Sequence, residues 1–257
     1  MRRRLVIPVL VAVLAFGPAA DSGAERVIKD GLELTFNADF APHTLPRDRQ
    51  APVSIKVSGR IASTDGSHPP PLRRLEVAIN RSGRLFTKGL PTCSAPILQS
   101  TSSEAAMERC RPSLVGRGSF RADVQLGKEI PATGKILAFN SRRHGKQALV
   151  LHLFAAVPVR FTLVVPLTIA HPEGGNFGTV LQAPIPRLGG GLGSITEIDL
   201  TIGRRYSYAG KRRSYISAAC SAPAGLNEVP FPFARGIFHF EGHQQMRETL
   251  TRVCRVR

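Results

Sequence analysis

Ile195-Thr196-Glu197-Ile198-Asp199-Leu200-Thr201-Ile202 is the stretch that decides the fold class. Its two charged residues, Glu197 and Asp199, are two positions apart, and apolar Ile198 and Leu200 stand at alternate positions. Successive side chains of a strand point to opposite faces, so this pattern is typical of a strand that buries one face. The alternation is imperfect, because Ile195 shares the phase of the charged residues.

Strand character of this kind recurs along the chain, and glycine- and proline-rich clusters at 65–71 and 188–193 separate the runs as turns. One helix is expected at 102–109, where Thr101 is placed to cap the first turn and Glu104 follows three residues on. The sequence therefore predicts an all-β protein with one short helix. The expected strands are 32–36, 53–61, 75–79, 120–126, 136–139, 148–154, 161–169, 195–202, 206–217 and 237–240.

Four short matches recur in the same order in the two halves, which raises the hypothesis of an internal duplication. If the halves are repeats, the chain forms two immunoglobulin-like β-sandwich modules, 25–131 and 132–257, each near the usual size of such a domain. The spacings between the matches differ, so one larger sandwich remains the alternative. The matched pairs are 34–37 with 137–140, 75–79 with 198–202, 93–96 with 220–223, and 117–120 with 235–238.

Residues 1–24 have the pattern of a signal peptide: three arginines, an apolar stretch at 5–16 and small residues up to Ala24. The adjacent arginines also admit a twin-arginine export signal. The apolar stretch is shorter than the roughly 20 residues that a membrane-spanning helix needs. The later apolar run 149–170 is interrupted by charged residues and prolines. We expect an extracytoplasmic protein, secreted or periplasmic, without a membrane span after signal cleavage.

The chain is strongly basic, with a formal net charge of +17 and a pI of about 11.1. Such a charge predicts weak, salt-dependent attraction to polyanions, and an anionic cell-surface polymer is the expected partner. No specific nucleic-acid site is predicted. The alternative is that the excess, which is almost all arginine, reflects codon composition.

The four cysteines, Cys93, Cys110, Cys220 and Cys254, are an even number in a chain expected to be exported. In an oxidising compartment they predict two disulfides. We favour Cys93 with Cys110 and Cys220 with Cys254, because these pairs close the shortest loops. Zinc is the competing interpretation, but the closely spaced cysteine pairs of zinc sites are absent from the sequence.

The sequence contains no Gly-x-Ser-x-Gly motif, so the nucleophile elbow typical of exported hydrolases is absent. The glycine-rich stretch 189–193 leads into a strand, so it lacks the helix N-terminus of a phosphate-binding loop. On an extended strand, His239, Glu241 and His243 would share a face and could bind zinc, but Glu241-Gly242 has the character of a hairpin turn. We predict no catalytic residue, metal or cofactor.

Two further groups of titratable residues remain open. His152, among apolar neighbours, is expected to be a structural strand histidine. The isolated carboxylates Asp39, Asp65 and Asp123 could form an acid pair in three dimensions, as glycosidases require, but the sequence does not select a pair.

Residues 203–217 concentrate binding chemistry, since all three tyrosines of the chain lie there among arginines and a lysine. A hairpin turning at Ala209-Gly210 would place aromatic surface beside fixed positive charge, which suits sugars, acidic polymers or exposed bases. The alternative is a solvated hairpin whose tyrosines cover the edge of the core and whose arginines protect the strand edge. The candidate ligand-binding residues are Arg204, Tyr206, Tyr208, Arg212 and Arg213.

The stretches 57–61, 70–76, 114–120 and 251–257 resemble those of exported bacterial all-β proteins of unassigned function. The resemblance implies a bacterial, extracytoplasmic setting, and it implies no activity, cofactor or site residue. We therefore expect a non-enzymatic exported protein that binds cell-surface or other acidic material. A hydrolase acting on envelope polymers or glycans is the alternative.

Overall fold

The computed structural model describes residues 24–126, 128–188 and 193–257. The predicted signal peptide lies outside these residues apart from Ala24, and the glycine-rich stretch 189–193 lies outside them apart from Gly193.

The described chain is mostly β-strand, as predicted, and every expected strand overlaps observed strand, although the run 206–217 is divided into three strands. The helical elements are α1 (Ala95–Leu98), α2 (Ser103–Cys110) and the 3-10 turns η1 (Arg111–Ser113) and η3 (Glu241–His243). The strands are β1 (Glu25–Lys29), β2 (Leu32–Ala41), β3 (Thr44–Leu45), β4 (Ala51–Pro52), β5 (Ser54–Ser63), β6 (Leu72–Asn80), β7 (Gly83–Leu85), β8 (Leu114–Leu126), β9 (Lys128–Arg143), β10 (Lys146–Ala155), β11 (Phe161–Ala170), β12 (Phe177–Pro184), β13 (Gly193–Ile202), β14 (Arg205–Tyr208), β15 (Lys211–Ser214), β16 (Ile216–Ala218), β17 (Glu228–Phe240) and β18 (Gln245–Val256).

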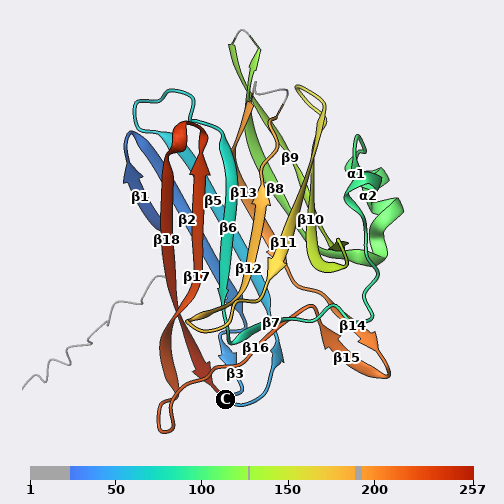
Figure 1. Cartoon of the computed structure of the whole chain (residues 1–257), viewed down its shortest axis with the longest axis vertical. Helices are drawn as coiled ribbons and strands as arrows, with labels where there is room; N and C mark the ends of the chain where they lie inside the picture. Colours follow the sequence, from blue (N-terminus) through green and yellow to red (C-terminus); the bar gives the residue numbers. More distant parts are fainter. Residues whose placement is uncertain (1–23, 127, 189–192) are drawn as a thin grey trace, which may run out of the picture.

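Thirteen strands form one sheet in the order β1-β2-β5-β13-β8-β9-β10-β11-β12-β6-β17-β18-β3. The sheet curls into a half-barrel, so that β18 returns to β1 and β2 at the other end of the order (Figure 1). Side chains join these ends: Lys29 Nζ donates to the carbonyl of Gln245 at 3.4 Å, and Gln244 Nε2 donates to that of Lys29 at 3.0 Å.

The two halves of the chain do not form separate sandwiches. β13, from the second half, lies between β5 and β8 of the first, and β6, from the first half, lies between β12 and β17 of the second. The boundary expected after residue 131 falls inside β9. One curled sheet built from interleaved strands therefore replaces the arrangement of two modules side by side.

β10 shows why some strands are apolar without alternation. Its Leu149 and Leu153 face the main core inside the curl, whereas Val150 belongs to a second core outside it. Leu98 and Ala106 of the two helices complete this outer core (Figure 1). A strand covered on both faces needs apolar residues at consecutive positions.

The imperfect alternation in 195–202 also has a structural cause. Between Ile195 and Glu197 the pairing of β13 with β8 shifts by one residue, which is a β-bulge. The shift changes the phase of the strand, so Ile195 and Ile198 both line the interior although they are three residues apart.

The helix expected at 102–109 is α2, but its cap is Ser102 and not Thr101. Ser102 Oγ accepts a hydrogen bond from the Ala105 backbone N–H at 3.2 Å. Thr101 is buried instead, where its hydroxyl donates to the Leu98 carbonyl at 2.8 Å. Both are good N-cap residues, and tertiary contacts decide between them.

The cysteines pair as predicted, Cys93 with Cys110 and Cys220 with Cys254. The first bond encloses the helices and the second ties the segment after β16 to β18. Among the described residues, no helix combines the length and apolar character that crossing a membrane requires.

Candidate ligand-binding cavity

The tyrosine hairpin, β14 and β15, packs against the chain and does not present its aromatic face to solvent. The Tyr206 hydroxyl contacts the carbonyls of Phe86 and Lys88 at 3.0 and 2.9 Å, and its ring stacks on that of Phe86 at 6.5 Å between centroids. Arg213 lies over the same Phe86 ring, 5.1 Å from its centroid. Burial raises the pKa of Tyr206.

Two more of the predicted ligand residues are also engaged within the protein. Arg204 Nη1 donates to the carbonyls of Pro112 and Leu114 at 2.5 and 2.8 Å. The Tyr208 ring lies so close to Gly89 that a Cβ there would meet it at 2.0 Å. Of the five candidates only Arg212 is exposed, and Arg205 and Lys211 are its exposed neighbours. These contacts agree with the alternative in which the hairpin covers the edge of the core.

The zinc arrangement considered for His239, Glu241 and His243 is broken by the turn between β17 and β18. Gly242 has a φ of +79° there, and His243 follows at a φ of +67°. In the described parts of the chain, His68, Asp123 and Glu129 are the one group of three such side chains with donor atoms close together.

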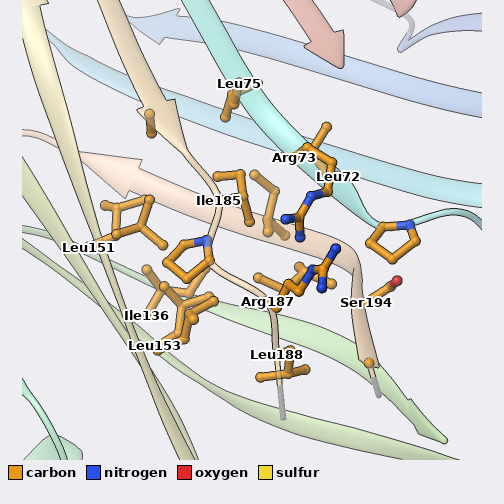
Figure 2. Close-up of a pocket in the computed structure, with 18 of the residues that line it drawn as sticks. Leu72, Arg73, Leu75, Ile136, Leu151, Leu153, Ile185, Arg187, Leu188 and Ser194 are labelled. Carbon is orange, nitrogen blue, oxygen red and sulfur yellow. The ribbon is translucent and has the colours of Figure 1, made fainter. Parts of the chain in front are cut away.

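An apolar cavity lies inside the curl of the sheet, in a place that the sequence did not indicate (Figure 2). Its volume is about 80 Å³, which is several times the minimum needed to hold one water molecule. Strands β6, β9, β10, β11, β12 and β13 form its wall. Aliphatic side chains dominate the lining, among them Leu72, Leu75, Ile136, Leu151, Leu153 and Ile185.

Positive charge enters this apolar lining at Arg73 and Arg187, close to Ser194 (Figure 2). In the pairing of β6 with β17, His239 lies opposite Arg74 and Phe240 opposite Leu72, so Arg73 is the extra residue of a bulge. A bulge redirects the side chain of its extra residue, which accounts for an arginine among leucines. Backbone bonding fixes the position, since the Ile185 N–H donates to the Arg73 carbonyl at 2.9 Å.

The two guanidinium groups differ in their partners. Arg187 is exposed and pairs with the carboxylate of Glu241 at 3.2 Å. Arg73 Nη1 is buried and has no hydrogen-bond partner among the described residues. An enclosed donor without an acceptor costs free energy, so this group is prepared to receive an anion.

A second apolar cavity of about 60 Å³, measured in the same way, adjoins the first. The two share four wall residues, Leu72, Leu75, Ile195 and Ile198. Rotation of these side chains would join the two spaces and lengthen the room for an apolar ligand.

The cavity has the chemistry of a binding site. Its described lining contains no histidine, cysteine or carboxylate, and Ser194 supplies its one hydroxyl. Sequence reasoning missed it because the lining combines single residues from six strands, and a strand pattern does not show which of them share one space. Arg73, within an apolar strand, was the single available signal.

Comparisons of the chain with known protein families, with curated proteins and with solved structures give no match.

Proposed function

We propose that this protein is a non-enzymatic, extracytoplasmic binding protein whose ligand is an amphipathic anion. The ligand class is an acyl chain or similar apolar group that ends in a carboxylate or phosphate. The observation that carries the proposal is the aliphatic cavity with the buried, unpartnered Nη1 of Arg73 at its polar side. The two disulfides support the extracytoplasmic setting, because such bonds persist in oxidising compartments.

Each part of the ligand has a physical counterpart in the cavity. Burial of an apolar chain contributes about 25 cal/mol per Å² removed from water. A carboxylate or phosphate gives Arg73 the acceptor it lacks, in a charge-assisted hydrogen bond of the strong class. Arg187 also lines the cavity, but its charge is offset by the pair with Glu241, so Arg73 is the main anion-binding group.

The charge of the whole chain fits the same role. Removal of the predicted signal peptide takes away three arginines and one aspartate, which leaves 32 basic and 17 acidic residues and a net charge of +15. This charge attracts the protein to anionic cell-surface material. Exposed Arg205, Lys211 and Arg212 on the hairpin add to this attraction. The anionic polymer is then the surface on which the protein works, and the cavity holds the ligand.

Calorimetric titration with decanoate, decyl phosphate and uncharged decanol tests the proposal. We expect both anions to bind and decanol to bind more weakly. Arg73→Gln should weaken the anions about tenfold or more and leave decanol unchanged, because a charged hydrogen bond contributes about 1.5–3 kcal/mol. Arg74→Gln is the matched control, since Arg74 is exposed on the other face of the same strand.

A second variant tests the apolar part of the cavity. Ala183 is buried in the wall, and Ala183→Leu should fill the cavity and weaken all three ligands. If the unaltered protein binds none of the three, or if Arg73→Gln and Arg74→Gln weaken decanoate equally, the proposed function is wrong.

A further inference from the structure

We propose that His68, Asp123 and Glu129 form a binding site for one divalent metal ion of the zinc class. Donor atoms of the three side chains lie within 4.8 Å of one another. Both carboxylates lie on the outer face of the half-barrel, and His68 contacts Ser194, which also lines the inner cavity. The argument for the metal rests on the donor atoms and not on the ligand of that cavity.

Strand register brings the two carboxylates together. Asp123 on β8 lies opposite Pro131 on β9, and Glu129 is two residues from Pro131 along β9. Residues opposite each other in an antiparallel pair, and residues two apart in one strand, point to the same face. The interior residues Ala122 and Val124 occupy the other face, so both carboxylates point outward.

His68 comes from the loop between β5 and β6, and its bonding leaves one nitrogen free. The Ser194 hydroxyl lies 3.2 Å from His68 Nε2 and 3.5 Å from the Pro69 carbonyl. We assign the hydroxyl proton to the carbonyl, so that the hydroxyl oxygen accepts from Nε2. Nε2 then carries the proton and Nδ1 a lone pair. Nδ1 is enclosed and has no partner among the described residues. An imidazole that donates a hydrogen bond through one nitrogen and keeps a lone pair on the other is the form that ligates metals.

The electrostatic balance of the site favours a cation. Neither Asp123 nor Glu129 forms an ion pair with a lysine or arginine among the described residues, so no basic side chain occupies their oxygens. Arg60 and Arg121 line the same cleft but make no such contact. Two carboxylates this close repel each other, and a dication would offset their repulsion.

The donor set suits zinc in chemistry and nearly in geometry. One imidazole nitrogen with two carboxylate oxygens is a zinc donor set, and three protein ligands leave a coordination position open. Zinc bonds of 2.0–2.2 Å place ligands about 3.4 Å apart, so donors that are up to 4.8 Å apart must approach by up to about 1.4 Å. Glu129 is exposed, and its side chain can make that movement.

Metal titration of the tag-free protein, freed of metal with a chelator, tests the site. We expect one strong Zn²⁺ site per chain by calorimetry, with Mn²⁺ and Ca²⁺ as comparisons. His68→Gln and the double variant Asp123→Asn/Glu129→Gln should each weaken Zn²⁺ binding at least tenfold, since even loss of a residue that only hydrogen-bonds to a ligand costs about 10–100-fold in metal affinity. Glu197→Gln, a carboxylate in the same cleft but outside the group, should leave the affinity unchanged.

Co²⁺ provides a measurement that needs no variant, because its visible absorption reports a site of nitrogen and oxygen ligands. We expect Zn²⁺ to displace it at one equivalent. The proposal is overturned if the unaltered protein binds no stoichiometric metal, or if well-folded variants keep its affinity. Hydrolysis of glycans without metal binding would also overturn it, in favour of the carboxylates as an acid–base pair. Binding of decanoate is measured separately, so either proposal can fail alone.

Discussion

His152 is a fully buried titratable residue whose protonation state can be read from its neighbours. The Thr101 hydroxyl donates to the Leu98 carbonyl, so its oxygen accepts from His152 Nε2 at 3.1 Å. The Thr101 carbonyl, which can only accept, lies 3.0 Å from the same nitrogen. Nε2 therefore carries the proton, and Nδ1 is buried without a partner among the described residues. Burial lowers the pKa of His152.

This environment predicts loss of stability in mild acid. The folded pKa of His152 is below its unfolded value of about 6.5, so below that pH the unfolded chain binds a proton that the folded chain excludes. The free energy of unfolding should fall by up to about 1.4 kcal/mol per pH unit until the pH reaches the folded pKa. Urea unfolding between pH 4.5 and 8 measures this slope.

His152→Gln should flatten that slope, although the variant will be less stable at pH 8. His144→Asn, at an exposed turn with a φ of +49°, is the control and should keep the slope of the unaltered protein. If His152→Gln keeps the acid slope of the unaltered protein, then exclusion of a proton by buried His152 is not the cause of that slope.

At the scale of single residues, the sequence predicted the disulfide pairs and the structural role of His152, but it did not indicate the residues of the cavity or of the metal site. Cysteine spacing gave the two disulfides, and the apolar neighbours of His152 indicated a structural histidine. Arg73 and His68 were not found, because a bulge in β6 directs one and a loop carries the other to residues more than 50 positions away. The pattern of residues along one strand shows neither the position of a bulge nor the path of a loop.

At the scale of elements, the two strands beside β13 differ in how closely they approach it, and each has a glycine at the point of contact. Gly118 on β8 pairs with Leu200, and a Cβ there would lie 1.9 Å from the Asp199 carbonyl oxygen. Gly59 on β5 pairs with Ile198, and the nearest atom to its Cβ would be 3.6 Å away. The first strand pair is too close for any side chain, and the second has room for a methyl group.

The two glycines should therefore respond differently to alanine. Gly118→Ala forces β8 and β13 apart, and we expect a loss of about 2 kcal/mol or more in the free energy of unfolding, as for other overpacked sites. Gly59→Ala should be neutral or slightly stabilising, because alanine has less freedom to lose on folding. Thermal and urea unfolding of both variants would measure this, and equal losses would contradict the close approach of β8 to β13.

For the hairpin β14–β15, the sequence predicted which side chains share a face but not what that face contacts. Alternation placed Tyr206 and Tyr208 on one face, and the structure agrees, since both contact the segment around Phe86 to Gly89. What a strand pattern lacks is the identity of the surface opposite that face. An aromatic face beside arginines can bind a ligand or pack against another part of the same protein. Here it packs against Phe86.

At the scale of the whole molecule, the matched segments of the two halves occupy equivalent places. In one half-sheet Phe120 pairs with Ile198 and Gly118 with Leu200. In the other, the matching residues pair in the same register, Phe238 with Leu75 and Gly236 with Val77. Each of these pairs joins a residue of the first half of the chain to one of the second. The repeated register supports the duplication hypothesis, with a strand exchanged between the halves.

The exchange predicts that neither half folds alone. A cut at the β9–β10 turn, between His144 and Gly145, interrupts no strand and leaves one disulfide in each fragment. Fragment 25–144 would lack β13 between β5 and β8, and fragment 145–257 would lack β6 between β12 and β17. Each gap leaves two strands with unpaired backbone groups and an open apolar face, which a lone fragment cannot satisfy.

Circular dichroism and amide hydrogen exchange should show each fragment without a cooperative transition and without protected amides. An equimolar mixture should recover both, because each fragment supplies the strand that the other lacks. The control is the uncut chain taken through the same unfolding and refolding. Cooperative unfolding of either fragment alone would mean that its strands can pair within one half, and the interleaved sheet would then not be the arrangement that holds the halves together.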